Sequence, residues 1–435
     1  MIIKRLVVST LLATTAWFSG GEAALAQDAL VPRIEIMVSD LSVFGANADG
    51  GIDRVAYTNA DLAAREYIIT QMKQAGLDVR FDTVGNIIGR RAGRNNDLPP
   101  IMFGSHIDSV PGGGNYDGQV GSIGALEVMN MLKDANIVTE HPLEMIIFQN
   151  EEGGPVGSAA VAGLMTADDL QAMTTSGYTI SEGIQRLGGD PGRYKDFHIQ
   201  TPIHAVMEWH IEQGGFLDEE GIDIGVVEGI VGIRWWDVTV DGFANHGGTT
   251  PMPGRQDALV AASKLVVAIN EIATNTPGRQ VATVGRIQAF PGAPNVIPGR
   301  VEMSLEIRDL DRAKMDWTFD QVKKKADDIS NQMNVSFRFN LSNVDNEPAP
   351  TDQRIRKMVE TAATKRGLSY KYMPSGAGHD AQHMAMITPT GMIFVPSKGG
   401  ISHSPNEYTS AEDIANGANV LFETILTLDK TPLNN

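Results

Sequence analysis

The sequence predicts an α/β protein with a mostly parallel sheet and helices on both faces, interrupted by a smaller inserted α+β domain. Between residues 57 and 229, short apolar runs alternate with helix-like patterns, which is the rhythm of parallel strand–helix–strand units. From about residue 230 the order becomes strand, helix, two strands, helix and strand, the split-βαβ pattern of a small domain. The first pattern returns near the C-terminus, so we expect the larger domain to be discontinuous.

The larger domain is expected to begin with an amphipathic helix over residues 57–75, because Leu62, Tyr67, Ile68 and Met72 share one helical face. The other elements expected here are short strand-like runs over 79–91, apolar strands over 100–106, 143–149 and 205–210, a helix over 121–133, and helical and loop structure over 165–203. Parallel sheets bind ligands at the carboxyl ends of their strands, so residues directly after these strands are the first candidates for a site.

The inserted domain is expected to contain strands over 233–240, 281–290, 300–309 and 335–341 and helices over 257–275 and 313–333. Residues 346–350 then form a linker rich in proline. The larger domain resumes with a helix over 353–366, a strand over 392–396 and a helix over 411–428. We therefore place a catalytic domain at 27–229 and 347–435 and a lid or dimerisation domain at 230–346.

The first 26 residues have the pattern of an export signal. Lys4 and Arg5 form a basic start, residues 6–18 are mostly apolar, and Ala24-Leu25-Ala26 is a small-residue cleavage site. The apolar run is shorter than the roughly 20 residues that cross a bilayer, and we expect no later segment to be long and apolar enough. We therefore expect a cleaved signal peptide over 1–26 and a periplasmic or secreted protein without a membrane anchor.

The composition excludes several classes of function. The 435-residue chain carries a formal net charge of −18 and has no cysteine. Nucleic-acid binding needs a basic face, so nucleic acid is not an expected partner. Without cysteine, the chain has no disulfides, thiolate ligands or thiol nucleophiles. Imidazole and carboxylate groups remain, and this set suits zinc or manganese bound for hydrolysis.

Five such groups lie in Gly-rich or strand-end strings and are candidate metal ligands: His106, Asp117, Glu152, His210 and His403. Each one alone is more often a packing, turn or surface residue, and only the joint pattern indicates metal binding. Five ligands are too many for one tetrahedral zinc with an open position, but they fit two metals roughly 3.5–4 Å apart if one carboxylate bridges them. We assign Asp117 as the bridge, His106 and His210 to one metal, and Glu152 and His403 to the other.

Glu151 is then the free carboxylate beside the metals. Water activated by two cations has a lowered pKa, and Glu151 can accept its proton and return it to the leaving nitrogen. Asp108, two residues after His106, is expected to orient that imidazole, with a purely structural cap as the alternative.

Several strings together resemble a known family: GSHIDSVPGGGNYDGQVG, FQNEEG, EWHIEQGGFLDEEG, NHGGTTPMPGRQDAL, PNVIPG, EIRD, SGAGHDA and GISHSPNE. From residue 63 to 426 the chain resembles the metal-dependent amidohydrolases that include N-carbamoyl-L-amino-acid hydrolases, β-ureidopropionases and allantoate amidohydrolases. These enzymes are relatives of dinuclear-zinc aminoacylases and carboxypeptidase G2-type peptidases. The peptidases usually have an acidic residue where His210 stands, so this histidine favours the amidohydrolase branch.

The resemblance implies roles for further residues. His246, on the inserted domain, would reach the partner subunit's active site and polarise the scissile carbonyl. Arg308 would hold the substrate carboxylate with its planar guanidinium. Without the resemblance, His246 is an ordinary loop residue and Arg308 a strand-end salt bridge. The other candidates for substrate contact are Gln213, Asn295, Gly376, Gly378 and His379.

The resulting hypothesis is a homodimeric hydrolase with two divalent ions per subunit, zinc or manganese, for which cobalt or nickel can substitute. It would cleave a linear amide or ureido C–N bond in a small carboxylate, with an N-carbamoyl-L-amino acid or an allantoate-like compound as the leading substrate. An aminoacylase- or dipeptidase-type exopeptidase on the same metal pair is the alternative. A non-catalytic binding protein is a third hypothesis, which the complete ligand set and Glu151 disfavour.

Overall fold

The computed structural model describes residues 21–196 and 202–433. The basic start and apolar run of the predicted signal peptide lie outside these residues, so that part stays a prediction. The first described helix, α1 (Gly21–Ser42), includes the predicted cleavage site. Leu30, Ile34 and Leu41 of α1 are buried, and the helix packs against α3 (Gln119–Asp134) and α11 (Ala411–Leu428). The part of α1 that would remain after cleavage therefore belongs to the core.

The larger sheet has nine strands in the described chain, in the order β1-β2-β4-β3-β5-β16-β6-β14, with β15 also paired to β6. The central strands β4, β3, β5 and β16 run parallel, and antiparallel pairs lie toward both edges. The predicted fold class, a mostly parallel sheet with helices on both faces, is therefore confirmed at the centre of the sheet. The strands are Asp78–Phe81 (β1), Ile87–Arg91 (β2), Ile101–His106 (β3), Leu143–Phe148 (β4), Ala205–Ile211 (β5), Ile224–Ile230 (β6), Ala349–Pro350 (β14), Tyr370–Ser375 (β15) and Thr390–Val395 (β16).

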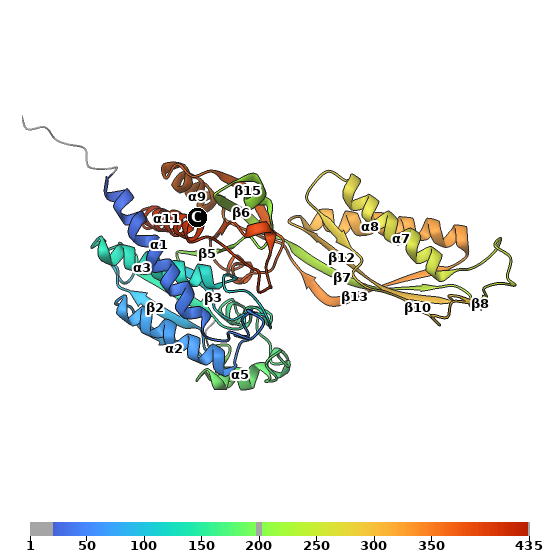
Figure 1. The fold of residues 1–435 in the computed structure, drawn as a ribbon, viewed down its shortest axis with the longest axis horizontal. Helices are drawn as coiled ribbons and strands as arrows, with labels where there is room; N and C mark the ends of the chain where they lie inside the picture. Colours follow the sequence, from blue (N-terminus) through green and yellow to red (C-terminus); the bar gives the residue numbers. More distant parts are fainter. Residues whose placement is uncertain (1–20, 197–201, 434–435) are drawn as a thin grey trace, which may run out of the picture.

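Helices cover both faces of this sheet (Figure 1) because successive strand residues point to opposite sides. Ile87 and Ile147 pack into the core that includes α1, α2, α3, α9 and α11. Ile88 and Ile146 pack on the other face with α4 and α10. The remaining helices are α2 (Asn59–Gln74), α4 (Val156–Val161), α5 (Ile180–Arg186), α6 (Phe216–Glu220), α9 (Gln353–Lys365), α10 (Asp380–Met384) and the 3₁₀ turns η1 (Asp169–Gln171), η2 (Pro191–Arg193) and η3 (Lys398–Gly400).

Trp209 links this packing to the carboxyl end of β5. Its side chain is buried between α3 and α11, where a Cβ on Gly124 would lie 1.3 Å and a Cβ on Gly417 2.5 Å from atoms of the indole. Glycine at both positions therefore lets the ring fill the space between the two helices. Because Trp209 is fixed in this way, the next residue, His210, is held at the opposite face of the sheet.

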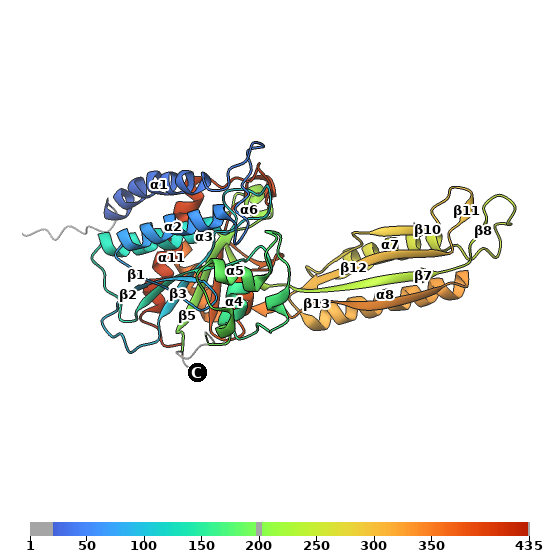
Figure 2. The same cartoon turned by 90° about the horizontal axis from the view of Figure 1, so that it is seen from below.

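The insertion forms a second sheet with its own core. It lies between Ile230, where β6 ends, and Ala349, where β14 begins, next to the predicted limits of 230–346. Its five strands have the order β10-β12-β7-β13 with β9 beside β12, and α7 and α8 pack on one face. Figures 1 and 2 show this insertion, here called the lid, extending away from the larger domain. Its elements are β7 (Gly232–Asp241), β8 (Asn245–His246), α7 (Ala258–Asn275), β9 (Val281–Thr283), β10 (Ile287–Phe290), β11 (Val296–Ile297), β12 (Arg300–Asp309), α8 (Arg312–Met333) and β13 (Ser336–Asn346).

The single strand predicted over residues 281–290 is divided into β9 and β10. Between them, the N–H of Arg286 donates to the hydroxyl of Ser304 at 3.1 Å, while the Arg286 carbonyl accepts from the Ser304 N–H at 3.0 Å. The Ser304 hydroxyl thus takes the place of a backbone carbonyl as the acceptor for Arg286, and the pairing with β12 is interrupted there.

The expectation that no segment after the signal is long and apolar enough to cross a bilayer is wrong for α7. By length and composition alone, this 18-residue helix is long and apolar enough to cross a bilayer, with a mean hydropathy of 1.2. In the structure, 33% of the helix is buried. Ala261, Leu265 and Ile269 pack into the lid core, whereas Val260 and Val267 are 45% and 57% exposed. One face of α7 therefore packs on the lid sheet, and the opposite face presents apolar side chains.

Candidate metal centre

The carboxyl ends of neighbouring parallel strands bring the predicted ligands together. His106 is the last residue of β3, Glu151 and Glu152 follow β4, and His210 is near the end of β5. His403 lies on the loop after β16. His106 is in register with the last residue of β4, and His210 with a residue near the end of β16, so these side chains meet at one edge of the sheet.

Asp117, on the loop between β3 and α3, belongs to two groups of potential metal-ligating atoms. Atoms of His106, Asp117 and His210 lie within 4.8 Å of one another, and so do atoms of Asp117, Glu152 and His403. Asp117 Oδ1 is 3.0 Å from His210 Nε2, and its Oδ2 is 3.2 Å from His403 Nε2. The structure thus groups these side chains in the two sets predicted from the sequence, with Asp117 common to both.

The charged groups of the centre shift one another's pKa. Burial raises the pKa of Asp117, but the neighbouring imidazoles outweigh it and hold this pKa well below its usual range. The hydrogen bond with Asp117 is the main cause that raises the pKa of His403 to about 9. Burial, and then the charge of Asp117, raises the pKa of Glu152 to about 7. Burial is also the main cause that raises the pKa of Glu151 well above its usual value. Buried carboxylates this close together call for positive charge among them.

The donor set fits divalent cations. Within the described chain, His106 Nε2 and Glu152 Oε1 are buried and have no hydrogen-bond partner, which is costly unless another group binds them. Gly118, at φ 66°, keeps the space beside His106 open, because a Cβ there would lie 2.1 Å from His106 Nε2. Imidazole nitrogen and carboxylate oxygen are ligands of zinc and manganese, so the cluster is suited to divalent metals.

Asp108 contacts the His106 imidazole, as expected, and also holds the two glutamates. Its Oδ1 lies 3.5 Å from Nδ1 of His106. The Nδ1 of His106 donates to the backbone carbonyl of Asp108 at 3.1 Å, which leaves Nε2 of the neutral ring free as a ligand atom. The Asp108 carboxylate accepts the backbone N–H groups of Glu151 at 3.3 Å and Glu152 at 3.1 Å. Asp108 therefore holds His106 chiefly through its backbone carbonyl, with its carboxylate nearby, and holds the two glutamates through its side chain.

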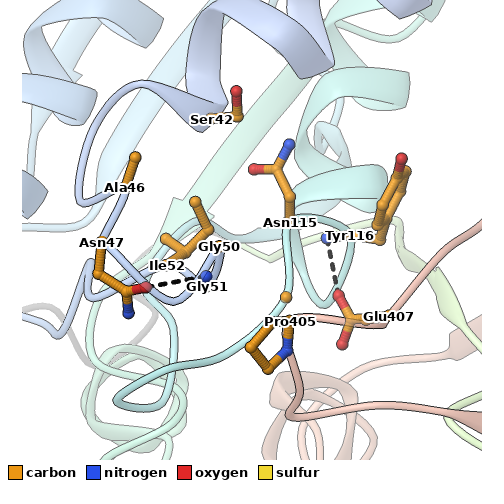
Figure 3. A pocket seen from close by; sticks show the side chains of 11 residues that line it. Ser42, Ala46, Asn47, Gly50, Gly51, Ile52, Asn115, Tyr116, Pro405 and Glu407 are labelled. Atoms are coloured by element: carbon orange, nitrogen blue, oxygen red, sulfur yellow. Dashed lines mark hydrogen bonds between the residues drawn. The ribbon is translucent and has the colours of Figure 1, made fainter.

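Glu407 is not among the residues that the sequence predicts, yet it joins the two loops that carry Asp117 and His403. Its Oε1 accepts the N–H groups of Tyr116 at 2.8 Å and Asp117 at 3.0 Å. Its Oε2 accepts the Ser402 hydroxyl at 3.0 Å and the His403 N–H at 3.2 Å. Figure 3 shows the carboxylate directed at Tyr116 on one side of a surface cavity. Its signals in the sequence are its place four residues after His403 and its position as the last residue of the string GISHSPNE.

His379 lies behind the metal centre. Its ring is 1% exposed, its centroid is 4.5 Å from that of His210, and its Nε2 is 2.8 Å from the Ser375 hydroxyl. Burial, and then the neighbouring His210, lowers the pKa of His379 well below its usual value. This buried ring packs against a candidate ligand and helps to position His210. Its predicted substrate contact stays a prediction.

Gln213 and Arg308 already have protein partners. Gln213 Nε2 donates to Asp117 Oδ2 at 2.6 Å. Arg308 forms the salt bridge that was the alternative interpretation, since its Nε and Nη2 lie 2.9 and 3.1 Å from the carboxylate of Glu306. Its Nη1 also donates to the Gly376 carbonyl at 2.7 Å, which ties the lid to the larger domain. The substrate contacts of Gln213 and Arg308 stay predictions.

The two predicted glycines do not need to be glycine for backbone reasons. Gly376 and Gly378 are exposed, and neither has a positive φ. A Cβ on Gly376 would meet none of the described atoms within 4 Å, and one on Gly378 would meet only a side-chain oxygen at 3.6 Å. Their predicted role in close approach to substrate stays a prediction.

His246 and Asn295 lie at the tip of the lid, where β8 pairs with β11, at the end far from the larger domain (Figure 2). The side chain of His246 is exposed, and its Nδ1 accepts the N–H groups of Gly248 at 3.0 Å and Thr249 at 3.1 Å. In the neutral ring the proton is therefore on Nε2. Within a single chain, neither residue meets the metal centre.

Comparison with known proteins agrees with this arrangement. Residues 102–427 match the model of peptidase family M20/M25/M40. The chain is similar to the N-carbamoyl-L-amino acid amidohydrolase of Geobacillus stearothermophilus, 37% identical over 91% of this chain and 98% of the relative. It is also similar to the allantoate amidohydrolase of Bacillus subtilis, 36% identical over 89% of this chain and 95% of the relative.

Solved structures show the same relationship. An amidase of the hydantoinase/carbamoylase family from Burkholderia multivorans is 38% identical and covers 93% of this chain and 98% of its own, with a TM-score of 0.86. Near-complete coverage means that the similarity includes both the larger domain and the lid. The fold, the clustered histidines and carboxylates and these similarities agree, and the chain belongs to peptidase family M20/M25/M40.

Proposed function

We propose that this protein is a metal-dependent amidohydrolase that cleaves a ureido or linear amide C–N bond in a small carboxylate. An N-carbamoyl-L-amino acid is the leading substrate and an allantoate-like compound the second. The observation that carries the proposal is the sharing of Asp117 by two donor groups, with Glu151 beside them. His210 in place of an acidic residue supports this activity over an exopeptidase on the same metal pair.

The chemistry divides between the metals and Glu151. Two divalent ions, zinc or manganese, held by the five candidate ligands would supply Lewis acidity and lower the pKa of a water molecule. Glu151 Oε2 lies 3.8 Å from His106 Nε2, and the residue belongs to neither donor group. It is thus free to take a proton from the attacking water and return it to the leaving nitrogen. An N-carbamoyl substrate would yield the amino acid, ammonia and carbon dioxide.

The active protein is, in this proposal, a homodimer in which the lid tip of one subunit enters the active site of the other. The distance of His246 and Asn295 from the metal centre of their own chain supports this arrangement (Figure 2). Nε2–H of His246 would donate to the oxygen of the scissile carbonyl as negative charge develops there. The exposed apolar residues Val260 and Val267 of α7 offer a surface on which two lids can pair.

The proposal includes export of the mature protein to the periplasm or the outside after removal of residues 1–26. The basic start, apolar run and small-residue site of the N-terminus support it. Cleavage there would leave Leu30, Ile34 and Leu41 of α1 in the core.

Replacing Glu151 by glutamine tests the proton-transfer step. We expect the rate of ammonia release from an N-carbamoyl-L-amino acid to fall roughly 10²–10⁴-fold, because the amide cannot accept the proton of the attacking water. The metal content, measured by mass spectrometry of the same sample, should be unchanged. Activity within about tenfold of the wild-type rate would remove Glu151 from this role.

Replacing Glu407 by glutamine tests the link between the two ligand loops. The amide nitrogen cannot accept the N–H groups that the carboxylate now holds, so we expect metal affinity to fall roughly 10–100-fold. Metal retained after dialysis against a chelator is the readout. Glu412→Gln, an exposed position at the start of α11, is the matched control. Equal retention by the two variants would show that Glu407 does not support the centre.

Mixing two inactive variants tests the action of His246 across the dimer. His246→Ala and Glu151→Gln should each be nearly inactive alone. After subunit exchange, a heterodimer would contain one site with an intact Glu151 and an intact His246 from the partner. An equal mixture should therefore recover about a quarter of wild-type activity. A mixture that stays inactive after exchange has been verified by mass would mean that His246 does not act across the interface.

A further inference from the structure

A cavity of about 540 Å³ lies where the lid joins the larger domain. Its walls come from three places: α6 with the segment before it, the end of β15, and the lid residues next to β9 and β12. Figure 1 shows β15 and β6 beside the base of the lid strands. The volume is in the range of small-molecule sites in proteins.

The cavity adjoins the metal centre through a lining residue that contacts Asp117. Gln213 lines the cavity, and its side chain donates to Asp117 at 2.6 Å. Gly376 and Ala377 line it too, and they lie three and two residues before His379, whose ring packs on His210. A substrate whose scissile bond lies at the metals therefore has room to extend along these residues into the cavity.

The lining of the cavity is mainly apolar. Phe216, Val231, Val281, Met373, Pro374 and Ala377 contribute its hydrocarbon surface.

Three cationic side chains at the cavity wall each have an acidic partner. Arg308 pairs with Glu306 at 2.9 Å, Arg279 pairs with Glu228, and Lys371 pairs with Glu220. The cations are thus balanced within the protein, and the cavity has no excess positive charge for a second anionic group of a substrate. The hydrocarbon walls also offer no partners for the N–H and carbonyl groups of a second ureido group. Of the polar lining side chains, Glu212 accepts the N–H groups of Phe216 and Leu217, and Nε2 of Gln213 donates to Asp117.

We propose that this cavity is the side-chain pocket and selects N-carbamoyl-L-amino acids with a large uncharged apolar side chain. The inference rests on the proposed amidohydrolase function and names the substrate class within it. An apolar side chain gains free energy by leaving water for these walls, whereas glycine leaves the pocket unfilled. An aspartate side chain or the second ureido group of allantoate would lose hydration without gaining partners.

The test compares four substrates on metal-loaded full-length protein: the N-carbamoyl derivatives of L-methionine, glycine and L-aspartate, and allantoate. We expect kcat/KM for the methionine derivative to exceed each of the other values by roughly tenfold or more. Turnover without this order would overturn the pocket assignment and leave the amidohydrolase function in place. Turnover of none of the four would overturn the proposed function, and this inference with it.

A variant of the pocket wall links the preference to these residues. Phe216 is 61% exposed, so Phe216→Ala removes apolar wall without disturbing the core. It should lower the preference for the methionine over the glycine derivative roughly tenfold. Phe81→Ala, 51% exposed on β1 at the opposite edge of the sheet, is the matched control and should leave the preference unchanged.

Direct binding gives a readout that does not depend on turnover. In the Glu151→Gln background, calorimetry should show tighter binding of N-carbamoyl-L-methionine than of N-carbamoylglycine, and Phe216→Ala should remove most of the difference. Equal binding of the two compounds, or a difference that Phe216→Ala leaves intact, would contradict the assignment.

Discussion

The placement of one carboxylate is the constraint on which the site depends. Asp117 lies close to histidines from β3, from β5 and from the loop after β16. Its Oδ1 faces His106 and His210, and its Oδ2 faces His403. The surrounding imidazoles stabilise its negative charge, yet Glu151 and Glu152 add further buried charge nearby. Bound cations would compensate this charge and hold the carboxylates ionised, so the geometry and the electrostatics of the cluster both favour metal binding.

The rest of the larger domain holds this carboxylate and its partners in place. Parallel pairing of β4, β3, β5 and β16 brings distant segments to one edge of the sheet. Trp209, fixed between α3 and α11, holds His210, and the absence of a side chain at Gly118 leaves room beside His106. Glu407 then connects the Asp117 loop to the His403 loop through four hydrogen bonds.

The two ends of the lid carry different candidate functional residues. Its base, with Val281 and Arg308, contributes to the cavity beside the metal centre of the same chain. Its tip carries His246 and Asn295 away from that centre. In the described residues, the chain crosses between the domains at Ile230–Gly232 and at Asn346–Ala349. A movement at these crossings would change the cavity and the tip position together.

Sequence patterns predict the elements whose apolar character is local. β3 and β4 are continuous apolar runs, and ligands placed directly after them predict the metal centre. β6 and β15 are not anticipated, because glycines interrupt the first and Lys371 and Pro374 the second, and each depends on pairing with the other. Contacts that join distant loops, such as those of Glu407, leave no periodic signal. The sequence predicts that Asp108 acts near His106, but only the structure shows which of its atoms does so.

The most direct test is the number of divalent ions bound per chain, in wild-type protein and in Asp117→Asn. After reconstitution with zinc or manganese and removal of free ions, mass spectrometry should find about two ions per wild-type chain, because two donor groups share Asp117. Asp117→Asn should lose most of both, since the amide removes charge from each group. A wild-type chain that binds a single ion, or an Asp117→Asn chain that retains two, would contradict the account.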